Sequence, residues 1–107
     1  MELKKQLKIK TGTFTRLRKE VQMYEREVTE QQEKISKMQQ EGRDEADIHK
    51  QMEILEESRN MIPDAHARLE QAKQSLMEQI DGTESAEQAE AVKESDEWRV
   101  AREALGL

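Results

Sequence analysis

Apolar residues recur every seven positions along the first third of the chain. An α-helix completes one turn in about 3.6 residues, so this spacing places them in one narrow stripe that must be buried against other helices. We predict one helix over about residues 3–41, ended by Gly42 and continuous through Gly12; a helix that begins after Gly12 is the alternative. The stripe consists of Leu7, Phe14, Val21, Val28 and Ile35, with Leu3, Leu17, Tyr24 and Met38 at the companion heptad position.

A second heptad pattern predicts another long helix over about residues 45–81, ended by Gly82. Because only a short connection separates the two long helices, we expect them to lie antiparallel. The apolar residues at seven-residue spacing in this helix are Ile48, Leu55, Ile62, Leu69 and Leu76.

Pro63 interrupts the second predicted helix. Its ring clashes with the carbonyl of Arg59 and it has no N–H to donate to that carbonyl, yet the heptad phase is unchanged from Ile62 to Leu69. We therefore predict a kink rather than an end of the helix. The kink is either a bend that wraps the helix around its neighbours or part of a contact surface.

A shorter third helix is predicted over about residues 85–104, where Ser85 and Gln88 match a capping box. The predicted fold is all-α: a single domain of residues 1–107 that forms an antiparallel three-helix bundle with coiled-coil-like packing. At 1.5 Å per residue the third helix reaches about 30 Å and the others about 54–58 Å. One side of the far half would then be left under-covered at Val28, Ile35, Met38, Ile48, Met52 and Leu55.

The composition agrees with long helices, since 39% of the residues are charged and 3% are aromatic. The net charge is −6, with seven basic and two acidic residues in 1–20 and eight acidic and three basic residues in 81–107. Either these two ends lie side by side or both are solvated. An acidic chain without aromatic residues among its Lys and Arg is not typical of nucleic-acid binding.

Neither secretion nor membrane insertion is indicated. The chain has no cysteine, no apolar run of signal-peptide length at its start, and no segment of roughly 20 apolar residues that would span a membrane. We therefore expect a cytoplasmic protein that contacts no membrane.

Residues suited to catalysis or metal binding are sparse. The two histidines, His49 and His66, are too far apart in the chain for a helical metal pair, and residues 44–47 lack the ligand spacing of a calcium loop. There is no glycine-rich phosphate loop, and a narrow helical bundle has little room for a pocket. We predict no enzyme activity, no metal and no cofactor.

Several segments of the chain are more specific than charged heptads: LKIKTG (7–12), Arg16-Leu17 with Lys19-Glu20, Met23-Tyr24-Glu25, Lys34-Ile35 with Lys37-Met38, EILEESRNMIPD (53–64) and Arg68-Leu69-Glu70. Together they resemble one known family, that of tubulin-binding cofactor A. The likeness covers about residues 7–76 and fades through the third predicted helix, where Trp98 and the C-terminal residues depart from the family pattern. Its most specific part is the segment 54–64, because a proline embedded in phase in a long heptad helix is unusual.

The resemblance implies a function without catalysis. It implies a small three-helix bundle that captures β-tubulin released from the cytosolic chaperonin and holds it for assembly of the αβ-tubulin heterodimer. It further implies hand-over to other tubulin-folding cofactors and a cytoplasmic, cytoskeleton-associated location. A monomer and a homodimer fit equally well, and a self-associating coiled-coil protein and a prefoldin-like general holdase are the alternatives.

Two surfaces are candidates for binding a partner. The first is a basic N-terminal face whose complement would be acidic: Lys8, Lys10, Arg16 and Lys19. The second is the region around Pro63 together with the far end of the long helices, where methionines could adapt to a partner. It consists of Glu57, Arg59, Asn60, Met61, Ile62 and Asp64, with Met38 and Met52.

Overall fold

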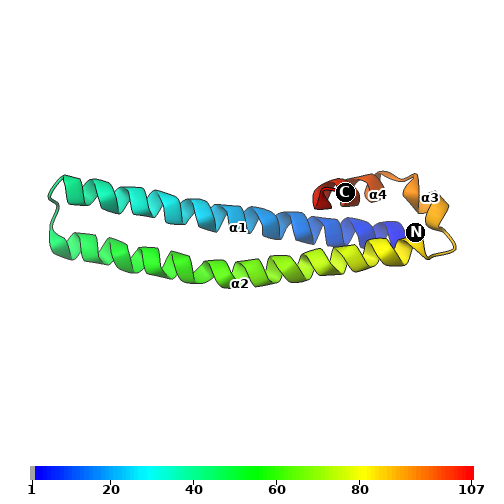
Figure 1. Cartoon of the computed structure of the whole chain (residues 1–107), viewed down its shortest axis with the longest axis horizontal. Helices are drawn as coiled ribbons and strands as arrows, with labels where there is room; N and C mark the ends of the chain where they lie inside the picture. The colour runs from blue at the N-terminus through cyan, green and yellow to red at the C-terminus, as the bar shows by residue number, and fades with distance from the viewer. Residues whose placement is uncertain (1) are drawn as a thin grey trace. The chain divides into compact units, whose positions relative to one another are not determined.

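The computed structural model describes residues 2–107, and every regular element in that range is a helix (Figure 1). The four helices are α1 (Glu2–Gln40), α2 (Glu45–Glu84), α3 (Ala89–Lys93) and α4 (Asp96–Leu105). The prediction of an all-helical fold without strands is confirmed for the described residues. α1 runs through Gly12 without a break, as the heptad register across it predicted.

The turn between α1 and α2 is built on Gly42. This glycine has a φ of 69°, a left-handed conformation that costs little only without a Cβ. The N–H of Arg43 donates to the carbonyl of Met38 at 3.0 Å, and the N–H of Gly42 donates to the carbonyl of Gln39 at 3.2 Å. These two bonds form a Schellman motif, which satisfies carbonyls that the end of α1 would otherwise leave unpaired.

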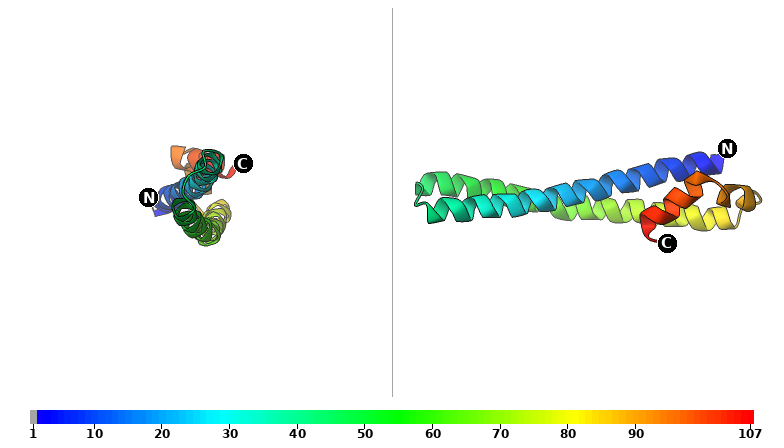
Figure 2. Two further views of the ribbon diagram at one scale, coloured as in Figure 1. Left: turned by 90° about the vertical axis from the view of Figure 1, so that its left-hand side faces the viewer. Right: turned by 90° about the horizontal axis from the view of Figure 1, so that it is seen from above.

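The chain divides into two compact units that α1 and α2 both pass through. Unit 1 contains residues 2–18 and 68–107, and unit 2 contains residues 19–67. In unit 1 the start of α1 and the end of α2 pack with α3 and α4 (Figure 2). The buried core of this unit consists of Leu7, Phe14, Ala72, Leu76, Ile80, Val92, Trp98 and Ala101.

The prediction of a single third helix was wrong, because the structure has two short helices there. The second helix does not end at Gly82, since α2 continues through it to Glu84. Residues 85–88 form a turn, and Ser95 begins α4: its hydroxyl accepts the N–H of Trp98 at 3.2 Å and donates to the carbonyl of Val92. Asp96 and Glu97 occupy the first turn of α4. A serine cap followed by two carboxylates is favourable at a helix start, whereas serine and aspartate are weak helix formers in a helix interior.

In unit 2 the end of α1 and the start of α2 are joined by the Gly42 turn and lie antiparallel. The side-chain nitrogen of Gln31 on α1 donates to the carbonyl and the side-chain oxygen of Gln51 on α2, at 2.9 and 2.8 Å. Pro63 lies inside α2, which continues on both sides of it, and the kink stays a prediction. The buried apolar residues of this unit are Val21, Ile35, Met38 and Ala65.

The prediction of an under-covered seam was wrong for part of its length. Ile35 and Met38 are buried, and only Met52, at 48% exposure, is largely open to solvent. Two helices can cover these positions because a heptad stripe faces its partner along a narrow line, which the neighbouring side chains close. Val28, Ile48 and Leu55 are half-buried.

Candidate partner-binding surfaces

Residues 2–107 contain no group of three or more His, Asp or Glu side chains that could hold a metal ion. Each histidine instead lies beside one glutamate at the surface: His49 Nε2 is 3.2 Å from Glu53 and His66 Nε2 is 3.4 Å from Glu25. No helix in that part of the chain is long and apolar enough to cross a membrane.

The residues of the predicted basic N-terminal face do not all lie on one side of α1. Lys8 and Arg16 are exposed on unit 1, whereas Lys10 is half-buried. Two residues along a helix correspond to about 200° of rotation, so Lys10 lies on the opposite side of α1 from Lys8. Lys19 is exposed and belongs to unit 2. Ile9 is 52% exposed, which adds an apolar side chain next to Lys8.

Arg18, which sequence alone does not distinguish from its basic neighbours, has a structural role in unit 1. Its Nη1 donates to the carbonyl of Ala104 at 2.8 Å, and its guanidinium lies 5.3 Å from the centre of the Phe14 ring. Ala104 is in the last turn of α4, where carbonyls lack helical partners. Arg18 therefore fastens the end of α4 to α1.

An exposed face of α2 in unit 2 combines apolar and acidic side chains. Ile54 and Met61 are 40% and 47% exposed and, being seven residues apart, lie on the same side of the helix. Glu57 follows Ile54 by three residues and Asp64 follows Met61 by three, so both carboxylates lie on this side of the helix. Both are exposed. We name these four residues, Ile54, Glu57, Met61 and Asp64, the Met61 face.

The remaining residues of the predicted Pro63 region do not belong to the Met61 face. Met52 and Arg59 are exposed but lie about 160–200° around α2 from Met61. Ile62 is half-buried, and Asn60 is exposed at the border of the face. Met38 was wrongly assigned to the surface, since it is 7% exposed in unit 2. Sequence analysis did not select Ile54, because it looked for apolar residues within the heptad stripe. The position of this isoleucine outside the stripe was the signal that could have identified it as an exposed apolar residue.

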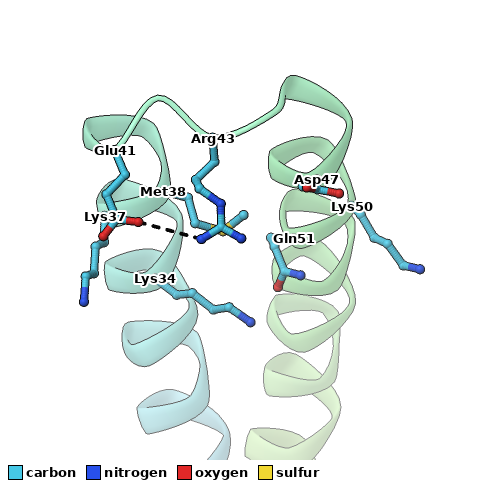
Figure 3. Close-up of a pocket in the computed structure, with 8 residues that line it drawn as sticks. All are labelled: Lys34, Lys37, Met38, Glu41, Arg43, Asp47, Lys50 and Gln51. Carbon is cyan, nitrogen blue, oxygen red and sulfur yellow. Dashed lines mark ion pairs between the residues drawn. The ribbon is translucent and has the colours of Figure 1, made fainter.

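A basic hollow lies at the turn between α1 and α2, wholly within unit 2 (Figure 3). Lys34 and Arg43 point into the space between the helices, towards Gln51, whereas Lys37 and Lys50 point outwards on opposite sides. Arg43 is 3.7 Å from Glu41, and both side chains are about half exposed. The residues that line the hollow are Lys34, Lys37, Met38, Glu41, Arg43, Asp47, Lys50 and Gln51.

The comparison with protein families matches nearly the whole chain. A family model described as tubulin binding cofactor A aligns with residues 2–105. The chain belongs to the tubulin binding cofactor A family. The match extends into α3 and α4, beyond the residues 7–76 over which the resemblance was clear from sequence.

Relatives from distant organisms support the membership in this family. Tubulin-specific chaperone A from Gallus gallus is 50% identical over 91 residues, which are 85% of this chain and 84% of the Gallus protein. Tubulin-folding cofactor A from Arabidopsis thaliana is 42% identical over 84 residues, which are 78% of this chain and 74% of that protein. Both are named as a chaperone or a folding cofactor, not as an enzyme.

Solved structures of cofactor A proteins share the fold. The crystal structure of tubulin folding cofactor A from Arabidopsis thaliana gives a TM-score of 0.87 at 38% identity, covering 99% of this chain and 94% of that one. Human tubulin chaperone cofactor a gives a TM-score of 0.77 at 43% identity, covering 97% and 95%.

Proposed function

We propose that this protein is a tubulin-folding cofactor that captures β-tubulin released from the cytosolic chaperonin and holds it for assembly of the αβ-tubulin heterodimer. The observation that carries the proposal is the family match over residues 2–105, together with relatives named for tubulin folding. The proposal includes hand-over to other tubulin-folding cofactors and action in the cytoplasm at the cytoskeleton. The architecture that we propose for this function is a three-helix bundle in which α3 and α4 together take the place of the third helix.

We assign the holding contact to the Met61 face. Ile54 and Met61 offer apolar surface for an incompletely folded partner, and Glu57 and Asp64 on the same side favour a partner with basic groups nearby. Methionine is flexible enough to fit an irregular surface. In this proposal, a bend of α2 at Pro63 sets the direction in which Met61 points.

The small size of this contact suits a holding function. Burying the exposed part of each of the two apolar side chains contributes roughly 1 kcal/mol, so the Met61 face alone gives weak binding. Lys8 and Arg16, with Ile9 beside them, offer a second contact on unit 1 for acidic surface of the client. Several weak contacts permit release when the next cofactor competes for the client.

The experiment is a pull-down of labelled β-tubulin released from the chaperonin, with α-tubulin and actin in parallel. Selective capture of β-tubulin is the expected result. Equal capture of all three proteins would instead indicate a general holdase. No capture by a protein that is helical by circular dichroism would indicate a self-associating helical bundle, and sedimentation would then show its oligomeric state.

A further inference from the structure

The basic hollow in unit 2 gathers cations from three successive segments of the chain. Lys34 and Lys37 come from the last turns of α1, Arg43 from the turn, and Lys50 from the start of α2. Only two acidic residues, Glu41 and Asp47, line the same hollow. This local excess of positive charge stands out in a chain whose net charge is −6.

Most of these cations are not neutralised by the protein. In residues 2–107, Lys34, Lys37 and Lys50 have no ion pair within 4.0 Å, and Arg43 has a single one with Glu41 at 3.7 Å. That pair is solvent-exposed, so it is weak and leaves other guanidinium N–H groups of Arg43 able to bind a second carboxylate. The hollow is therefore a positively charged site with unused donors.

Two uncharged side chains, Gln51 and Met38, also contribute to the hollow. Gln51 lies on α2 opposite Lys34 and Arg43, and its side-chain oxygen already accepts from Gln31 at 2.8 Å. The side-chain nitrogen of Gln51 is therefore a donor for an incoming acceptor. Because Gln31 holds this amide, the donor is positioned before a ligand arrives, which lowers the entropic cost of binding. The buried Met38 forms an apolar floor under Arg43.

We propose that this hollow binds an acidic, extended peptide segment of a partner protein. The cations differ in direction, with Lys34 and Arg43 inside and Lys37 and Lys50 at either side (Figure 3). Carboxylates spaced along a chain can reach all of them, whereas a single anion would meet only the inner pair. Nucleic acid fits less well, because none of the described residues that line the hollow is aromatic and could stack on a base.

The acidic-peptide site can be tested without tubulin, so its outcome is separate from that of the holding function. The probe is a short fluorescein-labelled peptide of alternating glutamate and glycine, and the reference is the same peptide with glutamine in place of glutamate. Anisotropy is measured against protein concentration at low and high salt. The expected result is binding of the glutamate peptide alone, weakened by salt because the contacts are screened.

Matched variants locate the binding. K34Q/R43Q should weaken the glutamate peptide by roughly fivefold to tenfold, while K73Q/K93Q removes two charges from exposed positions of unit 1 and should change it less than twofold. K34Q alone alters an exposed helical position and leaves the turn intact, so it guards against a folding defect, and R43K should retain most of the affinity. Equal losses in the two double variants, or equal binding of the two peptides, would overturn the proposal.

Discussion

At the scale of single residues, burial of the Thr11 hydroxyl lowers the free energy of unfolding, which the sequence does not show. Its side chain is buried in unit 1 at 6% exposure, and its Oγ1 has no hydrogen-bond partner among the described residues. Valine has the same shape without the hydroxyl, so we expect Thr11→Val to raise the free energy of unfolding by about 1 kcal/mol. Urea denaturation followed by circular dichroism measures this change.

Thr83 is the matched control for this prediction. It is fully buried, but its Oγ1 donates to the carbonyl of Gln79 at 2.8 Å. Thr83→Val removes a satisfied bond and should give no such stabilisation. A destabilised Thr11→Val protein would show that the Thr11 hydroxyl makes a hydrogen bond in solution, which contradicts an unpaired hydroxyl as the source of the cost.

Arg18 provides a second prediction at this scale, about how α4 is held. Replacing it with methionine keeps the contact with Phe14 but removes the donor to the Ala104 carbonyl, 2.8 Å away. We expect Arg18→Met to lower the free energy of unfolding by roughly 1–2 kcal/mol. Arg16→Met, at an exposed position with no such bond, should change it by less than about 0.5 kcal/mol. Equal effects of both variants on denaturation would contradict the structural role of Arg18.

At the scale of elements, two glycines with similar expected roles have different backbones. Gly42 is left-handed with a φ of 69°, whereas Gly82 lies inside α2 without a positive φ, and an added Cβ meets nothing within 4 Å at either position. Gly42→Ala should destabilise by about 1 kcal/mol and Gly82→Ala should stabilise by about 0.5–1 kcal/mol. Thermal unfolding of both variants checks the opposite signs. A stabilised Gly42→Ala protein would show that the turn is not left-handed in solution.

How far the elements follow from sequence depends on how much of their pattern is repeated. The long helices were predictable because five heptads of apolar residues determine both the helix and its buried side. The region after α2 was not, because its helicity depends on local caps. Ser95 with Asp96 and Glu97 was the signal for a new helix start, but an interrupted apolar side alone does not distinguish a break from a tolerated polar residue.

At the scale of the whole molecule, the candidate surfaces were only partly predictable. Heptad phase tells which residues face a partner helix, and it correctly placed Met61 outside the stripe and Met38 within it. Met38 was assigned to a binding surface only because the third predicted helix was expected to be too short to cover it. Lys10 was grouped with Lys8 by charge alone, although a spacing of two residues in the predicted helix already places them on opposite sides. Ile54 and the basic hollow needed the structure, because exposure and convergence across a turn are properties of packed helices.

The Met61 face, as the contact for β-tubulin, can be tested by removing its apolar side chains. Ile54→Ser with Met61→Ser removes most of its apolar surface and keeps Glu57 and Asp64. We expect roughly 25-fold weaker binding of β-tubulin, since losing roughly 1 kcal/mol per side chain lowers the affinity about fivefold for each of the two. Stability should fall by roughly 1–2 kcal/mol, because the two side chains, at 40% and 47% exposure, are partly buried in unit 2.

Met77→Ser is the control for this contact, since Met77 is 38% exposed on α2 but belongs to unit 1. It removes exposed apolar surface from the same helix at one side chain instead of two, so a general loss of nonspecific apolar binding would appear in both proteins, about half as large in the control. Pull-down of chaperonin-released β-tubulin at several concentrations of each variant compares them directly. If Ile54→Ser with Met61→Ser captures β-tubulin as well as Met77→Ser does, the client binds elsewhere, and the face around Lys8 and Arg16 becomes the surface to mutate.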